Sequence, residues 1–172
     1  MGKDELIREA QSRVKKIFVS NPDKAHSTTL ATAKIDEGLT CIFTQGEMTT
    51  TMDMPEIMGG DNKGPSPGFH ARAAIAGCVA IGIKQASASE NIHCESVNVA
   101  LEMDFDDAAM FGIGENKAAP LETRLTINIT SKVLPEIVQK LVERVLEMDP
   151  FYLALRDAQA VSSEVNIVSK HG

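Results

Sequence analysis

The sequence predicts a single α+β domain in which antiparallel strands are covered by two long helices. Segments with the two-residue alternation of strands occur in runs, within residues 28–54 and within residues 97–129, and do not alternate regularly with helices. Residues 66–86 and 131–147 have the length and the apolar pattern of buried or amphipathic helices. We therefore expect a sheet of about six strands packed on two central helices.

The composition limits the classes of function. The chain has 172 residues, of which 43% are hydrophobic and 24% charged, and this is the range of ordinary globular domains. Its net charge of −7 disfavours nucleic acid and anionic membrane surfaces as partners. The longest apolar run, residues 73–83, has about half the length of a bilayer-spanning helix. The three cysteines form no CxxC pair and the N-terminus is charged, so we expect a cytoplasmic protein.

The N-terminal segment is predicted to be a helix appended to the domain. Residues 4–18 carry apolar side chains among charged ones, and Pro22 ends this pattern. We therefore divide the chain into an appended helix and linker, residues 1–22, and one domain, residues 23–172.

Three strands and a long loop are predicted next. Residues 28–54 are rich in β-branched side chains and are interrupted at 36–38 and 45–47, which indicates three strands joined by tight turns. Residues 55–67 are rich in glycine and proline. A loop of this length is typical of functional segments.

The first long helix carries a cysteine in its middle. Ser66 is the expected N-cap residue and the helix continues to about residue 86. Ala74, Cys78 and Gly82 are spaced by four and form a stripe of small side chains. Cys78 either allows another helix to approach closely or is a reactive thiol. The second interpretation requires a cation from another segment, because Cys78 lies too far from the helix N-terminus.

The C-terminal half is predicted to contain two long strands, one long helix and shorter elements. The long helix has Pro135 in its first turn and a continuous apolar face. The elements are, in order, a strand at 97–103, a helical turn at 107–111, a strand at 121–129, a helix at 131–147, a short helix at 151–157 and a last strand at 163–168.

Metal and cofactor sites are not expected. His93 and Cys94 are adjacent on a strand and face opposite sides of it, and His26 and His70 have no acidic or thiol companion at ligand spacing. Cys94 follows the helix of Cys78 at a distance of roughly 16 Å, which is too far for a disulfide.

Four short motifs together resemble the signature of the OsmC/Ohr (organic hydroperoxide resistance) family. They are Asp53-Met-Pro55, Gly59-Gly60-Asp61, Gly64-Pro65-Ser66-Pro67 and Ala76-Gly77-Cys78. The resemblance implies an OsmC-like fold in which sheets wrap around two long central helices of an intertwined homodimer, with the active site at the subunit interface. It also implies that Cys78 stands in the position of the cysteine that attacks organic hydroperoxides.

Several supporting residues of that family are replaced in this sequence. Asp149 precedes Pro150 where the family's peroxidases have a resolving cysteine, so an external dithiol would have to reduce the oxidised thiol. Gly68 stands in the position of the active-site glutamate, and Lys34 is the one cation in the turn that carries the family's arginine. Asp149 is either a solvated turn residue or a carboxylate that approaches Cys78 and raises its pKa.

Two functions remain open, and with them whether the chain is an enzyme. The first is a thiol peroxidase of the oxidative stress response, which reduces organic hydroperoxides through Cys78 and an external thiol. The second is a non-catalytic dimer that binds an apolar or thiol-bearing small molecule. Supporting roles beside the thiol are expected for Lys34, Asp149 and His70. A substrate pocket is expected at Met54, Met58 and Phe151, where clustered methionines either form an apolar mouth or simply pack.

Overall fold

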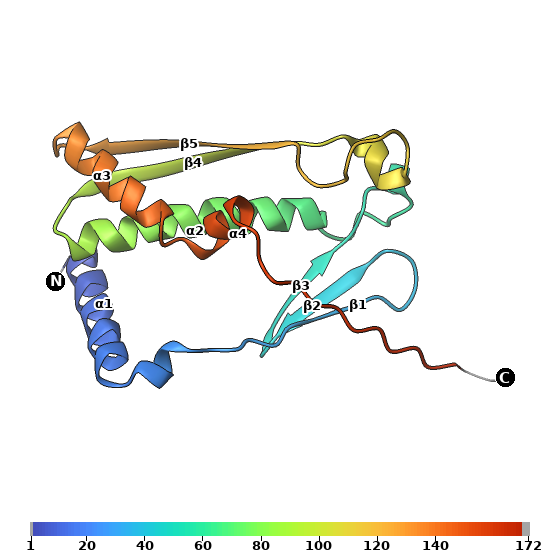
Figure 1. Ribbon diagram of the computed structural model, residues 1–172, viewed down its shortest axis with the longest axis horizontal. Coiled ribbons are helices and arrows are strands. Elements are labelled where there is room, and N and C mark those ends of the chain that lie inside the picture. The colour runs from blue at the N-terminus through green and yellow to red at the C-terminus, as the bar shows by residue number, and fades with distance from the viewer. Residues whose placement is uncertain (1, 170–172) are drawn as a thin grey trace.

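The computed structural model describes residues 2–169, which form four α-helices and five strands (Figure 1). The first elements are α1 (Lys3–Ser20), the 3-10 turn η1 (Pro22–Ala25), β1 (Thr32–Lys34), β2 (Cys41–Gln45), β3 (Met48–Met52) and the 3-10 turn η2 (Glu56–Met58). They are followed by α2 (Pro67–Ser89), β4 (Cys94–Asp104), the 3-10 turn η3 (Asp107–Phe111), β5 (Glu122–Ser131), α3 (Pro135–Leu146) and α4 (Pro150–Arg156). The α+β class and the predicted order of elements are thus confirmed up to α4. Within residues 2–169, no helix combines the length and the hydropathy needed to cross a bilayer.

The strands form two separate antiparallel sheets, and this corrects the expectation of a sheet of about six strands. One sheet has the order β1-β2-β3 and the other pairs β4 with β5. The sixth strand, predicted at 163–168, is not formed within the described chain. Residues 158–169 run as an extended tail without a ladder partner (Figure 1), and a strand needs such a partner for its backbone hydrogen bonds.

The cap predicted for α2 is present. Ser66 Oγ accepts a hydrogen bond of 3.3 Å from the Phe69 amide, and a proline occupies the first helical position. The helix continues to Ser89, beyond the predicted end at 86. The hydroxyl of Ser87 donates back to the Lys84 carbonyl at 2.9 Å, so this serine stays within the helix.

α3 begins later than predicted, at Pro135 instead of residue 131. Ser131 belongs to β5, where it pairs with Cys94, and its hydroxyl oxygen accepts the Val133 amide at 3.1 Å. Proline lacks the amide that a first helical turn leaves unpaired, so the helix starts at Pro135.

The core lies between α2 and the β4–β5 sheet, which runs along the length of that helix (Figure 1). Val79 and Ile83 of α2 and Val145 of α3 are buried at its centre. The strands add alternate side chains, which share one face of the sheet. They are Val97, Val99, Leu125, Ile127 and Ile129.

Much apolar surface is not covered by the chain itself. The β1–β3 sheet makes its main contacts among its own strands, whereas α2 contacts α1, β4, α3 and α4. The chain exposes 13088 Å², while a compact monomer of 18.5 kDa exposes about 8,200 Å². Ile57 and Ile167 are among several large apolar side chains that are more than four-fifths exposed.

Candidate functional site

Cys78 lies in the middle of α2 and faces the corner between α3 and α4, where its thiol lies beside the carboxylate of Asp149. The two groups meet because α2 has no side chain one turn further on, at Gly82. A Cβ atom there would lie 3.2 Å from Val145 Cγ1 and 3.8 Å from Asp149 Oδ2. The predicted stripe of small residues therefore allows the α3–α4 corner to approach the helix.

Asp149 is a buried N-cap residue, with 4% of its surface exposed. Its Oδ1 atom accepts the backbone amides of Phe151 at 3.0 Å and Tyr152 at 2.8 Å, and Pro150 takes the first position of α4. The interpretation of Asp149 as a solvated turn residue is therefore wrong. The alternative, in which its carboxylate approaches Cys78, describes the structure.

This environment favours the protonated form of the Cys78 thiol. Burial raises the pKa of Cys78 above its ordinary value, and the hydrogen bond and negative charge of Asp149 raise it further. The nearby backbone amide of Phe151 lowers the pKa of Cys78 and opposes these effects only in part. Because the thiolate is the nucleophilic form, the resting thiol is a slow nucleophile at neutral pH.

A cavity of about 380 Å³ opens beside the thiol and the carboxylate. Met148 and Asp149 form one wall and Cys78 forms part of another, while Gln11 and Lys15 of α1 complete it. We did not expect the two α1 residues, because the sequence indicates only a surface helix there. Their spacing of four places both on one face of α1, but the sequence does not say which surface that face covers.

Two of the expected supporting residues lie away from this cavity. Lys34, at the end of β1, forms an exposed ion pair with Asp36 at 2.8 Å and does not line the cavity. His70 is in the first turns of α2, roughly two turns before Cys78. Its Nε2 atom is buried and has no hydrogen-bond partner among the described residues. Within residues 2–169, no three His, Cys, Asp or Glu side chains come together in a way that could hold a metal.

The expected substrate-pocket residues are also dispersed. Met54 follows β3 and Met58 ends η2, and neither lines the cavity at Cys78. Phe151 contributes its backbone amide to the thiol and to Asp149, while its side chain is 49% exposed. The chain by itself does not bring the methionine cluster to the thiol.

The motif that begins at Asp53 has a structural role in the loop before α2. This carboxylate is 2% exposed and accepts hydrogen bonds from Thr40 Oγ1 at 2.9 Å and from the amides of Met54 at 2.7 Å and Lys63 at 3.1 Å. Burial alone would raise the pKa of Asp53, but these hydrogen bonds outweigh it and hold the pKa below its usual range. At Gly64 a Cβ atom would lie 2.5 Å from a carbonyl oxygen of β3, so the loop packs directly on that strand.

Comparisons with known proteins agree with this architecture. The family model described as OsmC-like protein matches residues 60–164. Among solved structures, the OsmC-like protein from Mycoplasma pneumoniae is 15% identical, with 76% of this chain and 88% of that chain covered and a TM-score of 0.64. An organic hydroperoxide resistance protein from Elizabethkingia anophelis is 22% identical, with 76% and 89% covered and a TM-score of 0.58.

An organic hydroperoxide resistance protein from Legionella pneumophila is also 22% identical, with 76% and 90% covered and a TM-score of 0.54. No curated protein matches the sequence. At these identities the likeness to solved structures shows a common fold. Because the family model spans more than half of the sequence, including Cys78 and Asp149, the chain belongs to the OsmC-like protein family.

Proposed function

We propose that the chain is a thiol-dependent peroxidase that reduces organic hydroperoxides through Cys78, with Asp149 as the acceptor of the thiol proton. The observation that carries this proposal is the placement of the thiol beside a buried carboxylate at the wall of a cavity. The fold supports it, since the similar proteins from Elizabethkingia anophelis and Legionella pneumophila are organic hydroperoxide resistance proteins.

The carboxylate of Asp149 allows a protonated thiol to react, because it can accept the thiol proton during the attack. As the sulfur of Cys78 attacks the terminal oxygen of the hydroperoxide, its proton passes to Asp149. The O–O bond breaks, a bond forms between sulfur and oxygen, and the electron pair leaves with the alkoxide. The alkoxide takes the proton from Asp149 and departs as an alcohol. Sulfur has then lost two electrons and is a sulfenic acid.

An external thiol completes the cycle. Cys41 belongs to β2 and Cys94 is buried at the start of β4, and neither lines the cavity at Cys78. An external thiol attacks the sulfenic sulfur and releases water, which leaves a mixed disulfide. A second thiol group then cleaves that disulfide and restores Cys78 as a thiol. A dithiol supplies both groups in one molecule.

Turnover of cumene hydroperoxide with dithiothreitol tests the proposal. We expect Cys78→Ser to abolish turnover. We expect Asp149→Asn to slow turnover at neutral pH, because the amide cannot deliver a proton to the departing alkoxide, a step that alkylation does not require. Asp157→Asn is the matched control, since Asp157 caps the other end of α4 and pairs with Arg156. Wild-type turnover no faster than that of Cys78→Ser would refute the peroxidase, and faster turnover in Asp149→Asn would refute the role of the carboxylate.

The raised pKa of Cys78 favours a second candidate, in which the cavity binds a small apolar or thiol-bearing molecule without chemistry. Lys34 is the cation expected to activate the thiol, but it is paired with Asp36. This agrees with a binding function that needs no activated thiol. Native mass spectrometry of the purified protein distinguishes the two functions. A retained ligand together with absent turnover supports binding, whereas turnover without a retained ligand excludes it.

We also propose that the working form is a homodimer. The exposed area exceeds that of a compact monomer of this mass by about 4,900 Å². Large obligate interfaces bury roughly 2,000–5,000 Å² counted over both partners, which is about 1,000–2,500 Å² per chain. A second copy of the chain would cover a large part of this excess. The extended tail fits such a copy, because Val165 and Ile167 alternate as in a strand and are 79% and 85% exposed.

A further inference from the structure

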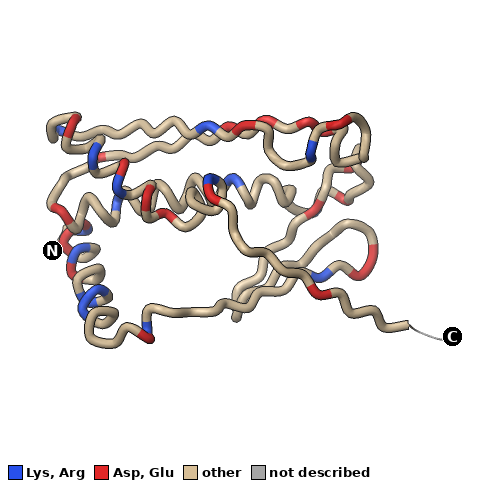
Figure 2. The backbone as a smooth tube through the Cα atoms, in the orientation of Figure 1, with Lys and Arg blue, Asp and Glu red and all other residues tan. Residues whose placement is uncertain are grey.

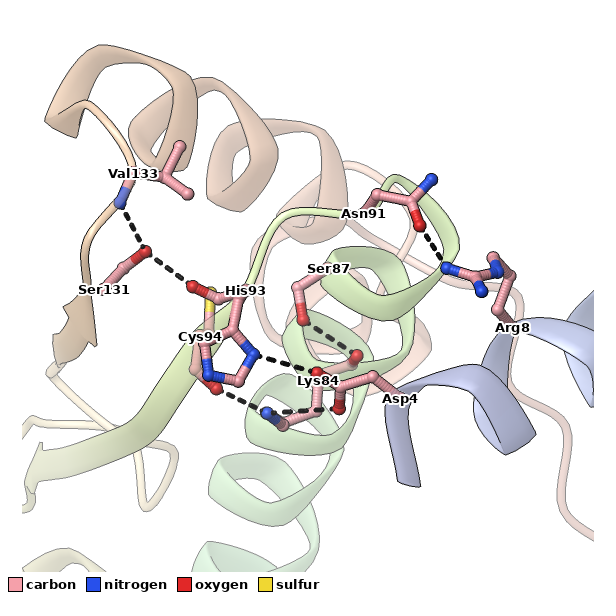
Figure 3. A network of polar contacts seen from close by, with 9 residues as sticks. All are labelled: Asp4, Arg8, Lys84, Ser87, Asn91, His93, Cys94, Ser131 and Val133. Atoms are coloured by element: carbon pink, nitrogen blue, oxygen red, sulfur yellow. Dashed lines mark hydrogen bonds and ion pairs between the residues drawn. The ribbon is translucent and has the colours of Figure 1, made fainter. Parts of the chain in front are cut away.

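α1 lies outside the segment that matches the family, and a polar network attaches it to the end of α2 and the start of β4 (Figure 3). Asp4 Oδ2 is 3.0 Å from His93 Nδ1, and Asp4 Oδ1 is 3.9 Å from Lys84 Nζ. Lys84 also donates to a backbone carbonyl of β4 at 2.6 Å, and Arg8 hydrogen-bonds to Asn91. These contacts fix which face of α1 turns toward α2.

The face of α1 that turns toward α2 carries basic residues, and one of them lies at the cavity that contains Cys78. Lys15 lines the cavity that contains Cys78. A second groove of about 540 Å³ is lined by Arg8, Lys15 and Lys16, and it shares Lys15 and Ser89 with the cavity. The two hollows therefore adjoin at Lys15. The acidic residues of α1 lie in its first half, and the charged residues of its second half are all basic (Figure 2).

The charged residues that line the groove are all basic, whereas the chain as a whole has a net charge of −7. Lys15 has no ion-pair partner among residues 2–169. The two acidic residues that line the cavity already have partners. Glu90 pairs with Arg144 at 2.5 Å, and Asp149 accepts hydrogen bonds from two amides of α4. Lys15 is thus available to a bound anion.

We propose that α1 makes the thiol site selective for anionic reactants and that Lys15 is the residue that determines this selectivity. The chemical class is a small apolar molecule that carries a carboxylate, because the cavity also has apolar walls at Ile81, Val145 and Met148. A cation within a Debye length, roughly 8 Å, raises the local concentration of anions. The inference rests on the proposed function, since it concerns the reactant of the same thiol.

Alkylation of Cys78 by a charged and a neutral reagent of similar size tests this inference. The full chain carries Cys41→Ser, so that Cys78 is the accessible thiol while Cys94 stays fully buried. The measured quantity is the ratio of the rate constants for iodoacetate and iodoacetamide. Both reagents consume the same thiolate, so the ratio is independent of the pKa of Cys78. N-acetylcysteine gives the ratio for a thiol without a protein environment.

We expect the ratio in the protein to exceed that of N-acetylcysteine and to fall by about two- to fivefold in Lys15→Gln, as for the loss of one nearby unit charge. Lys15→Glu lowers the ratio further. In 1 M salt, most of the difference in this ratio between wild type and the Lys15 variants disappears. Lys24→Gln, in η1 and outside both hollows, is the matched control and leaves the ratio unchanged. An unchanged ratio in both Lys15 variants overturns the inference.

The two proposals can fail separately. If the ratio responds to Lys15 but cumene hydroperoxide is not turned over, the peroxidase is refuted and the anion selectivity stands. If turnover is observed and the ratio does not respond to Lys15, only the selectivity is refuted.

Discussion

Removing the charge of Asp149 should make Cys78 more reactive toward alkylation. Asp149→Asn keeps an oxygen that can accept the amides of Phe151 and Tyr152, so α4 retains its cap. Two unit charges about 4 Å apart interact by about 1 kcal/mol in bulk water and about 4 kcal/mol at an effective dielectric constant of 20. Because the cavity is open to solvent, we take about 1–2 kcal/mol. This corresponds to an alkylation rate roughly 5- to 30-fold higher at neutral pH.

The assay is the rate of iodoacetamide modification as a function of pH, followed by intact-protein mass spectrometry in the Cys41→Ser background. The pH profile of Asp149→Asn should be displaced to lower pH relative to wild type. Asp157→Asn keeps the carboxylate beside the thiol and should match wild type. If α4 stays intact and the pH profile of Asp149→Asn coincides with that of wild type, the charge of Asp149 does not raise the pKa of Cys78.

The remaining predictions concern stability and assembly. The folded-state pKa of Cys78 is raised above its ordinary value of 9.0, so the thiol contributes stability below that pH and loses it as pH rises through the folded-state pKa. The stability advantage of wild type over Cys78→Ala in denaturant unfolding should therefore shrink above pH 9, and a constant difference would contradict the raised pKa. In sedimentation velocity, Val165→Asp and Ile167→Asp should each shift the proposed dimer toward monomer, while Asn166→Asp, on the opposite face of the extended tail, should have little effect. Tail variants that stay dimeric would exclude the tail from the interface.

The order of elements could be predicted because it depends on local features. Pro135 and the Ser66 cap mark helix starts, and the period of apolar residues distinguishes helices from strands. The sheet arrangement could not be predicted in the same way. Whether the segment at 163–168 becomes a strand depends on a neighbour, and no local pattern provides one.

The candidate site was predicted in part. Cys78 was found from its motif, and the stripe that ends at Gly82 indicated a close neighbour. Asp149 was ambiguous, because burial of a carboxylate depends on which helix packs over it and not on the residues beside it. Lys15 was missed for a similar reason, since the direction of α1 is fixed by contacts of Asp4 with residues that are far away in sequence.

The cap at the start of α4 also links the chemistry of the thiol to local unfolding. α4 has seven residues, and short terminal helices open more easily than the core to which they are attached. When its first turn opens, the Phe151 amide and the Asp149 carboxylate both leave the sulfur. The reactivity of Cys78 is then an average over closed and open states of this turn. Hydrogen exchange at the Phe151 and Tyr152 amides and modification of the thiol should therefore follow one common opening equilibrium.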